Sequence, residues 1–274
     1  MGRILHARWQ MAFGLLFVSI LFVLMLAPSI VAPYDPYELN TANRLRPPSP
    51  QHLFGTDEAG RDIFSRIIYG TRYSLGMSLA IVGLAVGLGT AIGCVAGLSG
   101  GRTDELLMRF VDVFLSFPRY ILAMAIASAL GPGIASSVLA LSALWWAAYA
   151  RLVRGKLLSI KENLFVEAAR ALGTNNWRIV WWHVLPHCVR EINAKMTLDF
   201  GTSLLALTGL GFLGLGMQNP APEWGLMVAN ARGYALSAWW YAFSPGLMIF
   251  LCVLSFVAIG DTLSEGSISD RPPM

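Results

Sequence analysis

Charged residues are scarce in this sequence. They make up 13% of the 274 residues, against the ~25% usual in soluble domains. Five stretches, each longer than 20 residues, contain no Asp, Glu, Lys or Arg. They lie between Arg8 and Asp35, Arg72 and Arg102, Arg119 and Arg151, Asp199 and Glu223, and Arg232 and Asp261. Since a membrane-spanning helix needs about 20 apolar residues, this composition excludes a soluble domain and predicts an all-α polytopic membrane protein.

Cysteine and histidine are also rare. Cys94, Cys188 and Cys252 are too far apart for a metal or redox motif, so we expect them to pack as small apolar side chains. His183 and His187 are four residues apart, but a proline lies between them and disfavours one continuous helical face. The sequence therefore predicts no metal site.

Two catalytic patterns occur, both within apolar surroundings. G-x-S-x-G at 97–101 follows an apolar stretch instead of a strand, and G-x-G-x-x-G at 209–214 lies inside one. Gly155-Lys156 lacks the first glycine and the Ser or Thr of a phosphate-binding loop. We predict no catalytic residue and no cofactor bound by this chain.

The net charge of +4 comes from 20 basic and 16 acidic residues. The basic residues lie in short segments between the apolar stretches, which is typical of topology determinants and not of a nucleic-acid surface. If both termini are placed in the cytoplasm, 14 of the 20 basic residues fall on the cytoplasmic side. This excess predicts that both termini are cytoplasmic. The uncharged stretch 9–34 exceeds the ~7–15 apolar residues of a signal peptide, so we expect it to be retained as the first span.

The apolar stretches predict about six spans. We place them at Met11–Val31, Tyr73–Leu98, about Leu106–Leu130, Ile134–Ala150, Met196–Met217 and Pro245–Leu263. The chain then divides into an N-terminal span with an outer loop, 1–72, and a permease-like core, 73–274, with a polar cytoplasmic loop at 151–195. Glycines spaced four apart in 83–97, and others in 209–216, predict close packing of helices within the chain or with a partner.

The third span draws charges towards the membrane. Gly131-Pro132-Gly133 favours a turn, so the span must start near Leu106 and include Asp112 and Arg119. Seven residues, about two turns, would put both on one side of a helix. They then form a possible intramembrane polar pair beside an aqueous path, or they lie at the cytoplasmic interface and snorkel.

The loop 151–195 carries a predicted helix–turn–helix. Ser159-Ile160-Lys161-Glu162 is typical of a capping box, and Gly173 is a natural helix stop. A second short helix is expected from Thr174, ending by Pro186. The apolar face of this unit needs a partner, which is the chain's own spans, lipid or another protein.

Within this loop, Glu167-Ala168-Ala169, then Gly173, then Leu185-Pro186 resemble the EAA signature of permease subunits of binding-protein-dependent ABC importers, with His183 where that pattern has Ile. Further blocks in the same order resemble the peptide/nickel permease family, in its dipeptide permease C branch. They are 54–62, Ser65-Arg66, 149–154, 212–216 and Gly260-Asp261.

This resemblance implies a type I ABC importer permease-like fold with cytoplasmic coupling helices between the fourth and fifth spans. By the same resemblance, Glu167, Ala168, Ala169 and Gly173 couple the permease to a cytoplasmic ATPase, which binds ATP and Mg. The implied partners are a homologous sister permease, one or two ATPase subunits, an extracytoplasmic substrate-binding protein and the bilayer of a prokaryotic inner membrane.

Several alternatives stay open at this point. The substrate implied is a di- or oligopeptide, or nickel or a nickel chelate. A stand-alone secondary transporter would show inverted repeats and paired mid-membrane charges, and a non-transporting scaffold is the third class. The segment Gly55–Arg72 contacts the sister permease or the binding protein, or it is a solvated, charge-balanced collar.

Overall fold

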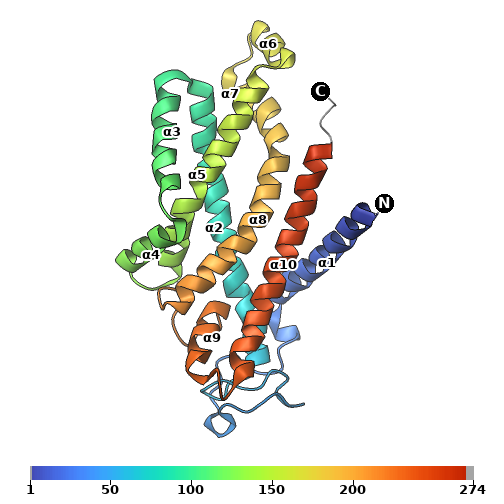
Figure 1. Ribbon diagram of the computed structural model, residues 1–274, viewed down its shortest axis with the longest axis vertical. Helices are drawn as coiled ribbons and strands as arrows, with labels where there is room; N and C mark the ends of the chain where they lie inside the picture. Colours follow the sequence, from blue (N-terminus) through green and yellow to red (C-terminus); the bar gives the residue numbers. More distant parts are fainter. Residues whose placement is uncertain (1, 270–274) are drawn as a thin grey trace.

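The protein is a bundle of long helices, shown for the computed structural model in Figure 1. The structure describes residues 2–269, and it describes their side chains except at 2–8, 169, 170, 176, 177, 183 and 265–269. The long helices are α1 (Gly2–Leu26), α2 (Ile63–Ser99), α5 (Ile134–Lys161), α8 (Leu185–Phe212) and α10 (Trp239–Ser269). The shorter ones are α3 (Gly101–Ser116), α4 (Arg119–Leu130), α6 (Leu164–Ala171), α7 (Asn176–Ile179) and α9 (Trp224–Ala231). Apart from one bridge between Thr56 and Asp62, the described residues contain no β-structure, so the all-α prediction is confirmed.

The helices α1, α2, α5 and α10 are long and apolar enough to cross a membrane, and α3 with α4 makes a fifth candidate if the pair is one broken span. The helix α8, where another span was predicted, is less apolar because it carries Lys195 and Asp199, which pair at 2.9 Å. Its 28 residues nevertheless measure about 42 Å, longer than the hydrocarbon core of a bilayer. The prediction of six spans therefore depends on α8 and on the broken pair.

Two helices extend beyond the spans predicted within them. The helix α2 begins at Ile63 and not near Tyr73, because the Asp62 carboxylate caps it by accepting from the Ser65 backbone N–H at 2.8 Å. Residues 72 and 73, the predicted division of the chain, both lie inside this helix. The helix α5 continues beyond Ala150 to Lys161, because Val153 and Leu157 remain fully buried on its core face.

The prediction of one continuous third span is also wrong. The helices α3 and α4 meet at an angle of 91°, with only Phe117 and Pro118 between them. Proline lacks the backbone N–H that a continuing helix needs, and it disfavours a helical conformation at the residue before it. Phe117 accordingly has an extended backbone, and α4 lies at the edge of the bundle, steeply inclined to the long helices (Figure 1).

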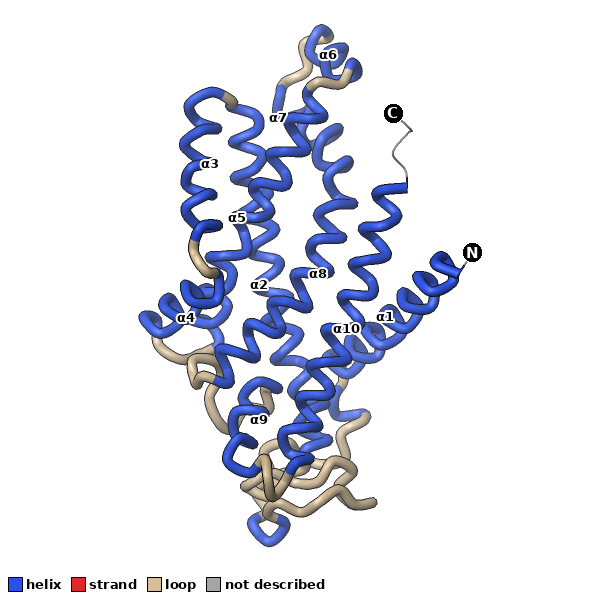
Figure 2. The backbone as a smooth tube through the Cα atoms, viewed as in Figure 1, coloured by secondary structure: helices blue, strands red, loops and turns tan. Residues whose placement is uncertain are grey.

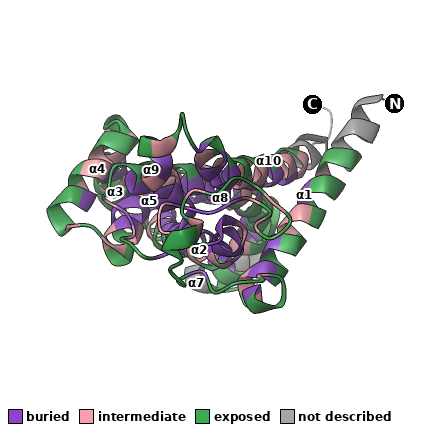
Figure 3. Cartoon of the chain, turned by 90° about the horizontal axis from the view of Figure 1, so that it is seen from below, coloured by how far each residue is buried: buried purple, intermediate pink, exposed green. Residues whose placement is uncertain are grey.

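The seam between α2 and α5 confirms the close packing that the glycine spacing predicted. A Cβ atom at Gly89 would lie 2.5 Å from Tyr149 Cβ, and one at Gly93 would lie 2.6 Å from the Ala150 carbonyl oxygen. These distances leave room only for glycine. A Cβ atom at Gly83 or Gly87, on the same helix, would meet nothing within 4 Å, so these two glycines do not pack within the chain. Buried residues concentrate in α2, α5 and α8, whereas α1 and α4 are exposed at the edges (Figure 3).

The two ends of the bundle differ in character. The helices α6 and α7 project at one end, and the loops of the segment 27–62 gather with α9 at the opposite end (Figures 1 and 2). The beginning of α1 and the end of α10 both point towards the α6 side (Figure 1). The bundle thus separates the helical projection α6–α7 from the folded loop segment 27–62.

Candidate functional site

The helix α6 follows α5 almost without interruption. Only Glu162 and Asn163 separate them, and the Asn163 carbonyl accepts from the backbone N–H groups of Val166 at 2.9 Å and Glu167 at 3.3 Å. The predicted capping box at Ser159 is therefore wrong. Ser159 lies inside α5, since Ile160 is still packed in the core at 8% exposure.

The exposed surface of α6 carries the residues that the resemblance singled out. Glu167 and Ala168 are exposed, whereas Val166 is fully buried and holds the helix against the core. The side chain of Ala169 lies outside the described part. Leu164 and Leu172 are 82% and 86% exposed at the two ends of the helix. This α6 surface, defined by Leu164, Glu167, Ala168 and Leu172, combines apolar side chains with one carboxylate and is typical of a docking surface.

The chain turns sharply where α6 ends. Gly173 has a φ of +79°, a conformation that favours glycine, as the predicted helix stop requires. The predicted end of the next helix at Pro186 is wrong, because Pro186 lies in the first turn of α8, where its missing N–H is not needed. A π-helical turn, Val180–Val184, joins α7 to α8. Val180 and Val184 are buried, so the return segment is anchored to the bundle.

Polar contacts join the C-terminal half of α5, which leads into α6, to neighbouring helices. Arg154 donates to Asp104 on α3 from Nε at 2.7 Å and from Nη2 at 2.6 Å. Lys156 pairs with Glu191 on α8, and Lys161 donates to the Leu98 carbonyl of α2 at 3.2 Å. Since these contacts reach three different helices, the end of α5 that leads into α6 is fixed to the bundle.

Asp112 and Arg119 do not share a helix face. Asp112 lies on α3 and pairs with Arg151 of α5, and both side chains are more than half exposed. Arg119 begins α4, on the other side of the 91° bend, and its guanidinium lies 4.8 Å from the centre of the Trp145 ring. The bend separates the two charges, so the one-face geometry predicted for them is wrong.

The segment Gly55–Arg72 contains a buried ionic cluster that sequence reasoning missed. Asp57, Arg61 and Arg66 are 0%, 5% and 1% exposed. The Asp57 carboxylate accepts from Arg61 Nε at 2.7 Å and lies 3.5 Å from Arg66 Nε. Arg66 Nη1 also donates to the carbonyl oxygen of Pro36 at 2.8 Å. A solvated collar is therefore wrong for these residues, and their spacing of four and five along the chain was the available signal.

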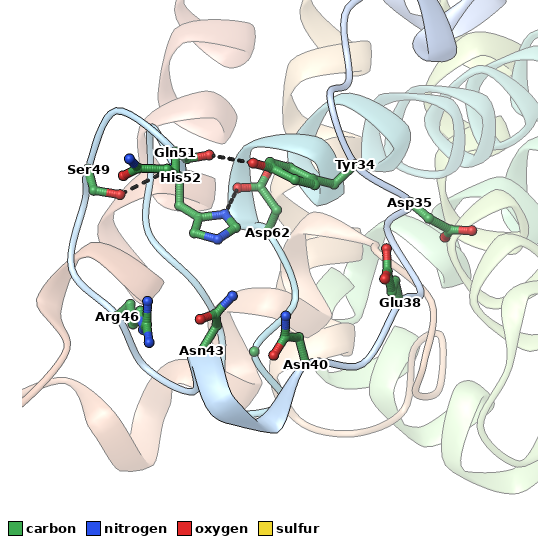
Figure 4. Close-up of a pocket in the computed structure, with 11 residues that line it drawn as sticks. Tyr34, Asp35, Glu38, Asn40, Asn43, Arg46, Ser49, Gln51, His52 and Asp62 are labelled. Carbon is green, nitrogen blue, oxygen red and sulfur yellow. Dashed lines mark hydrogen bonds and ion pairs between the residues drawn. The ribbon is translucent and has the colours of Figure 1, made fainter.

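A polar hollow opens beside this cluster. Its volume is about 420 Å³, and its side chains come from the segment 34–62 (Figure 4). His52 Nδ1 lies 2.9 Å from the Asp62 carboxylate, and the Tyr34 hydroxyl donates to the Gln51 carbonyl at 3.0 Å. These bonds fold the segment 34–62 into a defined surface at the end opposite α6.

Another buried carboxyl fastens α9 to α2. Glu223 is 1% exposed and accepts from the backbone N–H groups of Gly225 at 2.8 Å and Leu226 at 2.7 Å. Ser74 of α2 donates to it at 3.3 Å. Burial raises the pKa of the Glu223 carboxyl, and these hydrogen bonds act in the opposite direction.

Among the described residues, no group of three or more His, Cys, Asp or Glu side chains has a metal-binding arrangement.

The chain is similar to a known protein family and to several characterised proteins. The family described as "Binding-protein-dependent transport system inner membrane component" matches residues 89–266. The probable D,D-dipeptide transport system permease protein DdpC of Escherichia coli K12 is 40% identical over 251 residues, which cover 90% of this chain and 84% of that protein. The nickel transport system permease protein NikC of the same strain is 38% identical over 265 residues, covering 97% and 96%.

Among solved structures, an inward-facing conformation of the MetNI methionine ABC transporter contains a chain of similar fold. The TM-score is 0.62, over 74% of this chain and 97% of that chain. Because the sequences are only 18% identical, this likeness concerns the fold alone.

Proposed function

Since the chain belongs to the family of binding-protein-dependent transport system inner membrane components, we propose that it forms half of the translocation path of an ATP-driven importer of di- and oligopeptides. A homologous sister permease supplies the other half. One or two cytoplasmic ATPase subunits bind ATP and Mg, and an extracytoplasmic binding protein delivers the substrate. The chain is a transport subunit of a prokaryotic inner membrane, with both termini and α6 in the cytoplasm.

The observation that carries this proposal is the α6 surface. Leu164 and Leu172 are exposed to an extent that indicates a surface buried by a partner, and Glu167 lies between them. An ATPase groove with apolar walls and a basic residue would complement them. Ala168 has a small side chain, which permits close approach, and Gly173 permits the tight turn that follows. Glu167, Ala168, Ala169 and Gly173 are therefore the proposed coupling residues.

The mechanism follows from the continuity of α5 and α6. When the two ATPase subunits close on ATP, they displace the bound α6. Because α5 runs from α6 to the far side of the bundle in one 28-residue helix, about 42 Å long, the displacement reaches the membrane interior. The ties from α5 to α2, α3 and α8 make these helices move with it. The path between the two permeases then opens alternately outwards and inwards.

The substrate assignment comes from the relatives. The name of DdpC refers to D,D-dipeptides, and a 41% identical relative from Alkalihalophilus pseudofirmus is a dipeptide transport system permease protein. Nickel is the second candidate, since NikC matches nearly the whole chain. Uptake of radiolabelled dipeptide and of nickel by the same reconstituted importer separates the two.

The first test is affinity purification of the tagged chain in mild detergent, with mass spectrometry of the recovered proteins. We expect a second permease of this family and an ATPase. A chain recovered alone or as a homo-oligomer under several mild detergents would contradict the proposal. Uptake that needs neither ATP nor a binding protein would instead support a secondary transporter.

A further inference from the structure

Arg119 is a cation within the membrane-spanning part of the bundle. Its guanidinium lies over Trp145, which is about 17 Å along α5 from Ile134 and about 24 Å from Lys161. A hydrocarbon core about 30 Å thick that is crossed by α5 therefore includes this position. Charged side chains at such depth face a bundle interior or an aqueous path.

No carboxylate in the described part of the chain balances this charge. Asp112, the expected partner, is paired with Arg151. Arg119 is partly buried, and among the described side chains the Trp145 ring is the one charge-stabilising contact that it makes. A cation removed from water needs an opposite charge or hydrogen-bond acceptors. The position is therefore suited to an anionic group that comes from outside the chain.

Two hollows share Tyr120, the residue after Arg119, in their linings. One, of about 360 Å³, is bounded by Arg119 with Phe114, Phe117 and Tyr120. The other, of about 370 Å³, is almost wholly apolar and lies between α4, α5 and α8. Tyr120 lines both, so the charged and the apolar hollow adjoin each other. Met124, Leu205, Gly209 and Leu213 line the apolar one.

We propose that Arg119 and this apolar hollow form a substrate subsite in the translocation path, in which Arg119 binds a carboxylate and the hollow receives the adjoining apolar side chain. The carboxyl-terminal residue of a peptide has this combination of groups. Each hollow is within the size range of small-ligand pockets, about 300–1,000 Å³. This subsite rests on the proposed function and adds a residue that discriminates among substrates.

Gly209 allows the subsite to be probed without disturbing the fold. A Cβ atom at this position would meet nothing within 4 Å, so a larger side chain enters the hollow and not the packed core. Gly246 on α10 has the same open surroundings but lies outside the hollow, and it provides a matched control. Cys94, Cys188 and Cys252 are buried, which favours selective labelling of an introduced thiol.

The test of binding is the alkylation rate of Gly209→Cys by a small maleimide in the purified importer complex. Gly-Leu should slow the reaction several-fold, whereas Gly-Leu-amide, which lacks the carboxylate, should not. Adding Arg119→Gln should abolish the protection, and Gly246→Cys should react at one rate throughout. Absence of protection, or equal protection by the amide, would overturn the subsite. The subsite would also be overturned if Gly209→Cys reacted slowly without any peptide and Arg119→Gln caused the two permeases to dissociate. In that case the sister permease would occupy the hollow.

Transport distinguishes failure of the subsite from failure of the proposed function. In proteoliposomes, Arg119→Gln should lower the ratio of Gly-Leu to Gly-Leu-amide uptake about tenfold, the loss expected for one hydrogen bond to a charged group. Gly209→Leu should lower Gly-Leu uptake relative to Gly-Gly, and Gly246→Leu should not. Unchanged ratios with ATP-dependent uptake intact would overturn the subsite alone. Uptake independent of ATP in the unmodified complex would overturn the proposed function.

Discussion

Arg154 on α5 holds Asp104 on α3 through two hydrogen bonds, of 2.7 and 2.6 Å. The pair joins the helix that leads into α6 to the helix that precedes the 91° bend. Bidentate arginine–carboxylate pairs fix orientation as well as distance. In the proposed mechanism, a displacement of α6 would therefore reach α3, and through the bend it would reach α4 and the proposed subsite.

Replacing Asp104 should loosen this connection. Asp104 is only 9% exposed, and removing one partner of a charged hydrogen-bonded pair costs about 1–3 kcal/mol. We expect Asp104→Asn to lower the unfolding temperature of the purified complex and to reduce the substrate transported per ATP. Glu105→Gln is the control, because its pair with Arg109 is 59–73% exposed and worth about 0–1 kcal/mol. Equal effects of the two substitutions would contradict a special role for Asp104.

The glycine seam should not tolerate one additional methyl group. In Gly93→Ala the new Cβ would lie 2.6 Å from the Ala150 carbonyl oxygen and 2.9 Å from Val153 Cβ, and such overpacking costs about 1–3 kcal/mol. Gly83→Ala on the same helix meets nothing within 4 Å and should be neutral or slightly stabilising, because alanine favours helix. Thermal unfolding in detergent measures both. A tolerated Gly93→Ala would show that α2 and α5 are farther apart.

The buried outer cluster should depend on Asp57. Asp57→Asn would leave Arg61 and Arg66 without their shared carboxylate at 5% and 1% exposure, and breaking a buried ion pair costs about 3–5 kcal/mol. We expect loss of the folded outer segment, measured as faster protease cleavage in right-side-out vesicles. Asp35→Asn, at an exposed position of the same segment, is the control. Resistance to cleavage equal to the unmodified protein would contradict the importance of this cluster.

The sequence predicted the features that depend on a few local rules. Uncharged stretches identified the bundle, because a bilayer excludes charge over a fixed thickness. The spacing of Gly89, Gly93 and Gly97 predicted a close helix contact, and α5 provides it. Gly173 has the positive φ expected at a helix stop.

The failed predictions concern tertiary contacts that outweigh local patterns. The Ser159 capping box is overridden because burial of Leu157 and Ile160 favours continuing α5. The charges of 57–66 look solvent-exposed in the sequence, since nothing local shows that they neutralise one another in the interior. The spacing of seven predicts Asp112 and Arg119 on one helix face, but the chain bends by 91° at Pro118 between them, and the sequence does not fix the angle of such a bend.

The most direct test of the central claim, that α6 couples this permease to an ATPase, is Glu167→Lys in the reconstituted importer. Glu167 is exposed and makes no side-chain hydrogen bond or ion pair within the described part of the chain, so the change should leave the fold intact. Reversing the charge should weaken docking to a basic groove. The measurement is ATP hydrolysis stimulated by the substrate-loaded binding protein, with Glu105→Lys as the control for a charge reversal elsewhere on the exposed surface. We predict that Glu167→Lys abolishes the stimulation and the control retains it, whereas full stimulation with Glu167→Lys would contradict the account.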